Sequence, residues 1–195
     1  DLQERYLAYM VKQVLDKNEY ELKILGRDPE KLRPTTEGNF VRLPYDDAVK
    51  MLQEAGRDFK WGDDFGAPDE GYISEQYDRP VFIVNYPTSI KPFYMKKNPD
   101  NPKEYLCADV IAPEGYGEIF GGSEREGNYE VLKQQIIDAG LNLEDYQWYL
   151  DLRKFGGVPH SGFGMGFERT IAWVCHLDHI REAIPFPRLI NRMQP

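Results

Sequence analysis

The stretch that most constrains this chain is "SGFGMGF" at residues 161–167, in which glycine occupies every second position. Side chains alternate across a strand, so an extended conformation places Gly162, Gly164 and Gly166 on one face. Each glycine weakens a strand by about 0.5–1 kcal/mol relative to alanine. A face without side chains allows close approach to the backbone, either by a planar heterocycle such as adenine or by a packed helix or strand. The pattern leaves both possibilities open.

The remaining residues of this stretch point the other way. Phe163, Met165 and Phe167 would lie on the opposite face, where they suit a hydrophobic core. Arg169 follows just past the end of the stretch. Because a guanidinium both stacks on flat rings and binds oxyanions, we expect Arg169 to cover a bound ring or to pair with a phosphate.

A second group of polar residues lies in "ADVIAPEGYGEIFGGSERE" at residues 108–126. Asp109 and Glu118 fall on adjacent expected strands and have no obvious basic partner in the sequence, which suits Mg²⁺. Arg125 follows a double glycine and suits a small carboxyl or carboxamide group. For each residue alone, a solvated surface position is the commoner explanation, with Arg125 paired to a neighbouring glutamate.

The order of the expected elements indicates an α+β fold, an antiparallel β-sheet flanked by helices, rather than a doubly wound parallel sheet. Apolar spacing predicts helices, and β-branched or aromatic runs predict strands. Residues 62–71 read as an acidic loop. The expected helices lie at 1–18, 46–56, 128–140 and 143–157, and the expected strands at 79–87, 93–97, 105–113, 117–126 and 162–167.

Composition limits the classes of function. The 195 residues are 41% hydrophobic, enough for one domain with a core. A net charge of −9 argues against a dedicated nucleic-acid-binding module but not against an enzyme with an RNA substrate. Two unpaired cysteines and three scattered histidines predict no zinc, and nothing indicates an organic prosthetic group. The absence of a secretory segment or a membrane-spanning stretch predicts a cytoplasmic protein that contacts no membrane.

With these residues in view, "GFGMGFER" resembles motif 3 of the class II aminoacyl-tRNA synthetases. Four further blocks, in the same order, are similar to the asparaginyl family of that class. They are "IKPFYMK", "ADVIAPEGYGEIFGGSERE", "YQWYLDLRKFGGVPHS" and "HIREAIPFPR". The resemblance implies a catalytic domain of the class II type and an ATP-dependent ligation of asparagine to its tRNA through an adenylate.

The resemblance also implies roles on the nucleotide side of the site. Arg169 would lie over the adenine and reach the γ-phosphate. Glu118, with Asp109 as companion, would hold Mg²⁺ on the ATP phosphates. The three glycines of the alternating stretch would form the floor beneath the adenine.

On the amino-acid side, the resemblance implies that Arg125 contacts the side-chain carboxamide oxygen of asparagine. Tyr94 either lines the amino-acid pocket or is a core tyrosine. His160 is expected to make a structural hydrogen bond.

The family's motifs 1 and 2 and its N-terminal anticodon-binding domain have no match here. We therefore expect residues 1–195 to be the C-terminal portion of a catalytic domain, inactive alone and part of a longer homodimeric protein that binds asparagine, ATP and tRNA(Asn). Three alternatives remain: an aspartyl-tRNA synthetase of relaxed specificity, a tRNA-independent asparagine synthetase paralogue, and a non-catalytic binding module.

Overall fold

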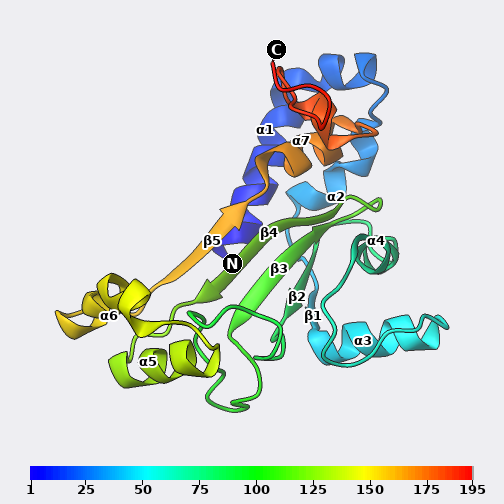
Figure 1. Ribbon diagram of the computed structural model, residues 1–195. Helices are drawn as coiled ribbons and strands as arrows, with labels where there is room; N and C mark the ends of the chain where they lie inside the picture. Colours follow the sequence, from blue (N-terminus) through cyan, green and yellow to red (C-terminus); the bar gives the residue numbers. More distant parts are fainter. Residues whose placement is uncertain (195) are drawn as a thin grey trace.

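The computed structural model describes residues 1–194, which form a central five-stranded sheet flanked by helices. The strands lie side by side in chain order: β1 (Arg42–Pro44), β2 (Val81–Val84), β3 (Cys107–Ala112), β4 (Gly117–Glu124) and β5 (Ser161–Met165). From β2 to β5 all neighbours are antiparallel (Figure 1). The expected α+β fold with an antiparallel sheet is confirmed for these four strands.

The first strand differs from the expectation, because β1 runs parallel to β2. Helices α3 (Tyr45–Glu54) and α4 (Ala67–Ser74) lie between the two strands in the sequence. Parallel neighbours require such a long crossover, whereas antiparallel ones can be joined by a tight turn. The sheet is therefore mixed, with its parallel pair at the edge opposite β5.

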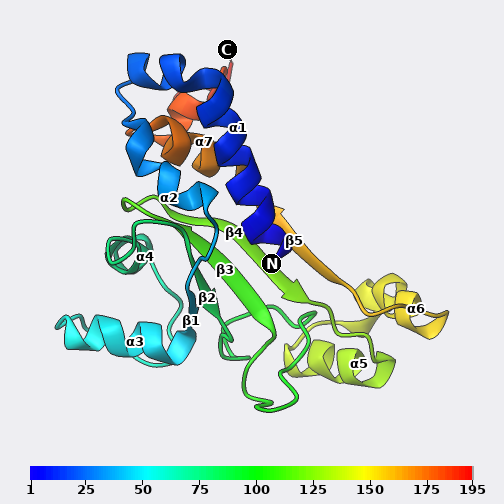
Figure 2. The ribbon, with the colours of Figure 1, turned by 180° about the vertical axis from the view of Figure 1, so that it is seen from behind.

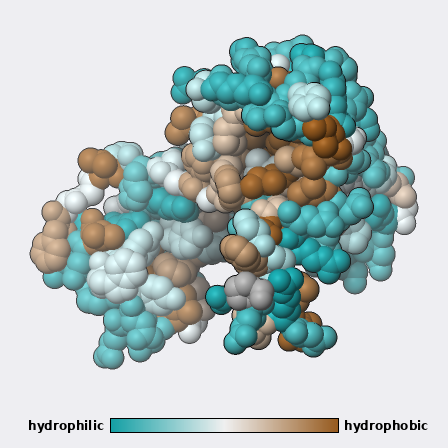
Figure 3. Space-filling model, turned by 90° about the horizontal axis from the view of Figure 1, so that it is seen from above, coloured by the Kyte–Doolittle hydropathy of each residue, from teal (hydrophilic) through white to brown (hydrophobic). Residues whose placement is uncertain are grey.

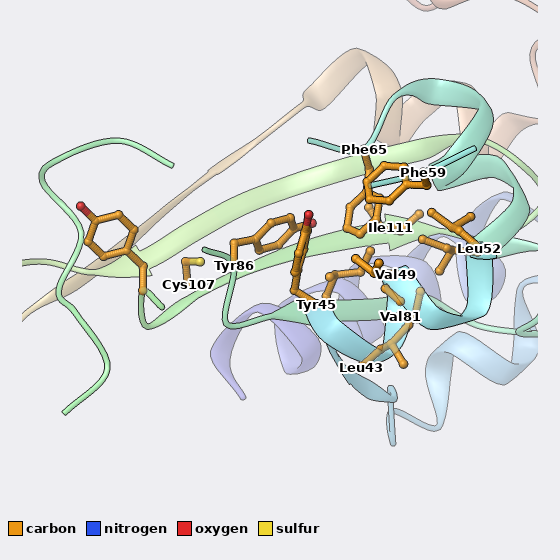
Figure 4. Packing of buried hydrophobic residues seen from close by; sticks show 14 of the residues in the cluster. Leu43, Tyr45, Val49, Leu52, Phe59, Phe65, Val81, Tyr86, Cys107 and Ile111 are labelled. Carbon is orange, nitrogen blue, oxygen red and sulfur yellow. The ribbon is translucent and has the colours of Figure 1, made fainter. Parts of the chain in front are cut away.

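Helices cover both faces of the sheet, and each face has its own hydrophobic core. On one face, α1 (Leu2–Ile24) and α7 (Phe167–Cys175) pack over Phe82, Val110 and Phe120 (Figures 1 and 2). On the other, α3 and α4 pack over β2 and β3. Figure 4 shows that second core, where Leu52 and Val49 of α3 face Ile111 of β3.

Other helical segments complete the fold. The helices α5 (Tyr129–Asp138) and α6 (Gln147–Lys154) form a satellite around buried Leu132, Ile136 and Leu150. The other segments are α2 (Arg33–Thr36) and the 3-10 turns Pro29–Lys31, Leu143–Tyr146 and Ile180–Ala183. Every helix within residues 1–194 is too short or too polar to cross a bilayer.

Two expected elements are wrong. Residues 93–97 make only isolated bridges, through Met95 to Arg125 and Lys97 to Tyr105, so they form no strand. The second half of the expected acidic loop at 62–71 is helical, because α4 begins directly after Gly66. Its start has a proline near the first position, and the Asp69 carboxylate accepts a hydrogen bond from the Gly66 amide at 3.3 Å. Both features favour a helix start.

The alternating glycine stretch does form a strand, β5, paired with β4. The strand ends at Met165, and Gly166 is the residue that caps α7. Of the apolar residues on the opposite face, Met165 packs against the core, but Phe163 is 37% exposed and Phe167 is 59% exposed. The expectation that all three belong to the core is wrong, because β5 is an edge strand and Phe167 begins a surface helix.

An apolar groove lies between α1 and α7 on the face away from the glycines. Its volume is about 420 Å³, and its walls include Met10, Val14, Phe167 and Ile171. From above, hydrophobic atoms gather in a hollow of this part of the surface (Figure 3).

Candidate active site

Two carboxylates converge on one point of the sheet, over Gly121. Asp109 on β3 is opposite Gly121 on β4. A β-carbon added to Gly121 would lie 2.7 Å from Glu118 Oε1 and 3.3 Å from Asp109 Oδ1. In a regular strand, residues 118 and 121 would face opposite sides, but a register shift between Val110 and Ile111 places both on one face. We call Asp109 and Glu118 the carboxylate pair.

The electrostatics of the carboxylate pair favour a bound cation. Burial and then the nearby Asp109 charge raise the pKa of Glu118 to about 7. Residues 1–194 contain no cluster of three or more His, Cys, Asp or Glu side chains arranged to hold a metal ion. Mg²⁺ needs no such cluster, since it takes one or two carboxylates and completes its shell with water and phosphate oxygens. The carboxylate pair therefore fits Mg²⁺.

Glu70 is a site residue that the sequence analysis missed. Its Oε2 accepts a hydrogen bond from the Glu118 amide at 2.9 Å, which fixes the backbone of β4 at the carboxylate pair. Burial raises the pKa of Glu70, and the charge of Arg169 opposes that shift. Glu70 lies on α4. Pro68 and Asp69 mark the start of that helix in the sequence, and this was the signal that could have indicated an ordered segment here.

Lys91 is a second missed residue, and it corrects the expectation that the carboxylate pair has no basic partner. Its Nζ lies 2.8 Å from Asp109 Oδ2 and 3.5 Å from Asp64 Oδ1. The same ammonium lies 3.9 Å from the centre of the Tyr86 ring. Burial alone would lower the pKa of Lys91, but the charge and hydrogen bond of Asp109 and the charge of Asp64 together outweigh burial and raise the pKa, so the side chain stays charged.

Arg125 is held at one end of the glycine strip, which consists of Gly162, Gly164 and Gly166. Its Nη1 donates to Ser123 Oγ at 2.6 Å and its Nη2 to the Gly162 carbonyl at 3.3 Å. The guanidinium carbon lies 4.7 Å from the centre of the Tyr94 ring. The structure thus brings Arg125, Tyr94 and Gly162 together.

The alternative, in which Arg125 pairs with a neighbouring glutamate on the surface, is wrong. The neighbouring Glu124 pairs with Lys96 at 2.5 Å. His160 contributes through its backbone, since its carbonyl accepts the Arg125 amide at 2.9 Å, while its ring contacts the Val158 carbonyl.

Arg169 lies at the other end of the glycine strip. Its aliphatic stem passes Gly166, where an added β-carbon would be 3.5 Å away. Its Nη1 donates to the Glu118 carbonyl at 2.9 Å, which ties this exposed guanidinium to β4 beside the carboxylate pair. A polar cavity of about 700 Å³ opens beside it, and Glu70, Glu118 and Arg169 share its wall.

The middle of the strip is open. A β-carbon at Gly164 would meet no atom within 4 Å among the described residues. The alternative in which a helix or strand of this part of the chain packs on the glycines is therefore wrong. The strip runs between two guanidinium groups, with Arg125 at the Gly162 end and Arg169 at the Gly166 end.

Comparison with known proteins identifies the family of this chain. The family described as "tRNA synthetases class II (D, K and N)" matches residues 1–190. The asparagine–tRNA ligase of Lactobacillus helveticus is 99% identical over the whole chain, which covers 45% of that protein. The ligase of Lactobacillus delbrueckii is 77% identical, with the same coverage. This chain therefore spans just under half the length of these relatives.

Solved structures give the same result. Asparaginyl-tRNA synthetase from Pyrococcus horikoshii, complexed with asparaginyl-adenylate, matches all of this chain and 44% of its own, with a TM-score of 0.96 and 47% identity. An aspartyl-tRNA synthetase from Entamoeba histolytica matches with a TM-score of 0.87 and 26% identity, over all of this chain and 41% of its own. Fold and sequence agree, and the chain belongs to the class II tRNA synthetases of the D, K and N group.

Proposed function

We propose that this chain is the C-terminal portion of the catalytic domain of an asparagine–tRNA ligase. The observation that carries the proposal is the open glycine strip, flanked by Arg125 and Arg169 and adjoining the carboxylate pair. The 99% identical relative named asparagine–tRNA ligase and the solved adenylate complex support the choice of amino acid. In the first step the asparagine carboxylate attacks the α-phosphorus of ATP and releases pyrophosphate. In the second, a terminal ribose hydroxyl of tRNA(Asn) takes the asparaginyl group and AMP leaves.

Each end of the strip has its own part in this reaction. The adenine lies on bare backbone over Gly164, with Arg169 covering the ring and reaching the terminal phosphate. Because the Arg169 guanidinium is already oriented by the Glu118 carbonyl, little reorganisation is needed when charge develops on the phosphates.

The carboxylate pair holds the metal of the nucleotide. Glu118, with Asp109, would bind Mg²⁺, which when bound neutralises negative charge on the phosphates. Gly121 lets both carboxylates approach the same point. No side chain forms a covalent intermediate, since positioning and charge neutralisation suffice for this step.

Arg125 selects the amino acid. Its guanidinium is fixed by Ser123, by the Gly162 carbonyl and by the Tyr94 ring. In this position it donates a hydrogen bond to the side-chain carboxamide oxygen of asparagine. A fixed fork of donors discriminates by geometry as well as charge.

The rest of the protein supplies what this half lacks. We propose that the arginine on the α-phosphate, the tRNA-binding domain and the homodimer interface lie in the part of the relatives that this chain does not cover. The protein works in the cytoplasm, where asparagine, ATP and tRNA(Asn) are available. Residues 1–195 alone should give no asparagine-dependent pyrophosphate exchange, and exchange at the rate of a full-length relative would contradict this division of the site.

The decisive experiment uses a full-length hybrid, defined as the Lactobacillus helveticus relative with this chain in place of its matching residues. We expect ATP–pyrophosphate exchange that depends on asparagine, and charging of tRNA(Asn). Exchange with aspartate as fast as with asparagine would indicate an aspartyl enzyme of relaxed specificity. Release of free asparagine from aspartate would indicate the tRNA-independent synthetase, and absence of any adenylate would indicate a binding module.

A further inference from the structure

Lys91 lies in the block "IKPFYMK", yet the proposed chemistry gives it no part. It sits in the segment between β2 and β3, which also carries Tyr94. Its side chain is only 13% exposed, and that of its partner Asp109 is 10% exposed. A buried lysine needs a reason, because burying an ammonium costs free energy unless it is paired.

The position of the ammonium gives that reason. Three groups surround it: the Asp109 carboxylate at 2.8 Å, the Asp64 carboxylate at 3.5 Å and the face of the Tyr86 ring at 3.9 Å. Each of these groups attracts a cation. Lys91 therefore occupies a cation position on one member of the carboxylate pair, while Glu118 forms no ion pair among the residues described.

Resting on the proposed function, we infer that Lys91 is a built-in counter-cation: it occupies Asp109 until the nucleotide arrives, and so keeps a free divalent cation off the carboxylate pair. A metal ion that binds without nucleotide must either displace the ammonium from Asp109 or bind beside it against the repulsion of its positive charge. A metal ion that arrives with the ATP phosphates has additional oxygen ligands and needs less from Asp109. Lys91 is thus a positioning residue that makes metal binding depend on nucleotide.

A lysine that competes with the metal and a lysine that only supports Asp109 predict opposite changes in metal affinity when Lys91 is removed. If Lys91 only held Asp109 in place, its removal would weaken metal binding. If Lys91 competes with the metal, its removal strengthens metal binding. Removing a unit charge this close to a carboxylate should increase the affinity for a divalent cation about tenfold or more.

The test measures Mn²⁺ binding to the full-length hybrid without nucleotide, by electron paramagnetic resonance. We expect Lys91→Met to bind Mn²⁺ about tenfold more tightly than the unmodified hybrid. Lys91→Gln keeps a hydrogen-bond donor for Asp109 without the charge, so it should show the same gain even if the methionine variant folds poorly. Lys91→Arg keeps the charge and should behave like the unmodified protein.

Two controls locate the effect. Lys96→Met removes a lysine that pairs with Glu124 outside the carboxylate pair, and it should leave Mn²⁺ affinity unchanged. Adding Asp109→Asn to Lys91→Met should abolish the gain, since the freed carboxylate is then absent.

The result that would overturn the inference is Mn²⁺ affinity that is unchanged or weaker in both Lys91→Met and Lys91→Gln. This outcome is separate from failure of the proposed function, which would appear as no asparagine-dependent exchange in the unmodified hybrid, whatever the Mn²⁺ titrations give.

Discussion

A single methyl group at Gly164 tests the central claim about the glycine strip. In Gly164→Ala the new β-carbon meets no atom of residues 1–194 within 4 Å, so the free protein has room for it. Replacing a strand glycine by alanine should stabilise the fold by about 0.5–1 kcal/mol. A ring stacked on the strip would meet the same methyl group directly. Overfilling of this kind costs about 1–3 kcal/mol, which corresponds to roughly 5- to 150-fold weaker ATP binding.

The two effects have opposite signs, which makes the prediction easy to contradict. In the full-length hybrid, we expect calorimetry with ATP and Mg²⁺ to show the loss of affinity, and thermal unfolding to show an equal or higher Tm. The matched control is Gly127→Ala, which also adds a β-carbon into open space but lies outside the strip, just before α5. ATP affinity that is the same in the Gly164 and Gly127 variants would refute the view that a purine lies on this backbone.

Three further predictions concern the rest of the site. In Gly121→Ala the new β-carbon would lie 2.7 Å from Glu118 Oε1, so the Glu118 carboxylate must move. We expect the rate of adenylate formation to fall about 100-fold with little change in Tm. A normal rate would contradict a metal position shared by Glu118 and Asp109. Arg125→Lys loses the fork held by Ser123 and should lower kcat/KM for asparagine about 10- to 150-fold, with an unchanged KM for ATP; a parallel rise in the ATP KM would place Arg125 elsewhere. The raised pKa of Glu118, about 7, means that its ionisation destabilises the fold as pH rises from about 4.5 to 7. With metal chelated, Glu118→Gln should therefore raise Tm at pH 8 more than at pH 5, and a pH-independent difference would exclude this cause.

The sequence predicted the features that depend on local spacing. Alternation along 161–167 predicted a strand with one bare face, because side chains alternate in any extended chain. Helical spacing predicted α1, α3 and α5, although α1 continues to Ile24 past a non-helical residue at Asn18. The same local reasoning failed at 93–97, where a β-rich run forms no strand because its backbone hydrogen bonds go to separate partners.

What the sequence alone determined was the set of groups: a glycine strip, two carboxylates, two arginines and the resemblance that connects them. Only the tertiary structure decided which of them meet. The bulge that turns Glu118 toward Gly121, the lysine on Asp109 and the Glu70 side chain on the Glu118 amide all join residues from different elements. Such contacts depend on how strands register and how loops close over a sheet, and neither is set by the spacing of residues within one element.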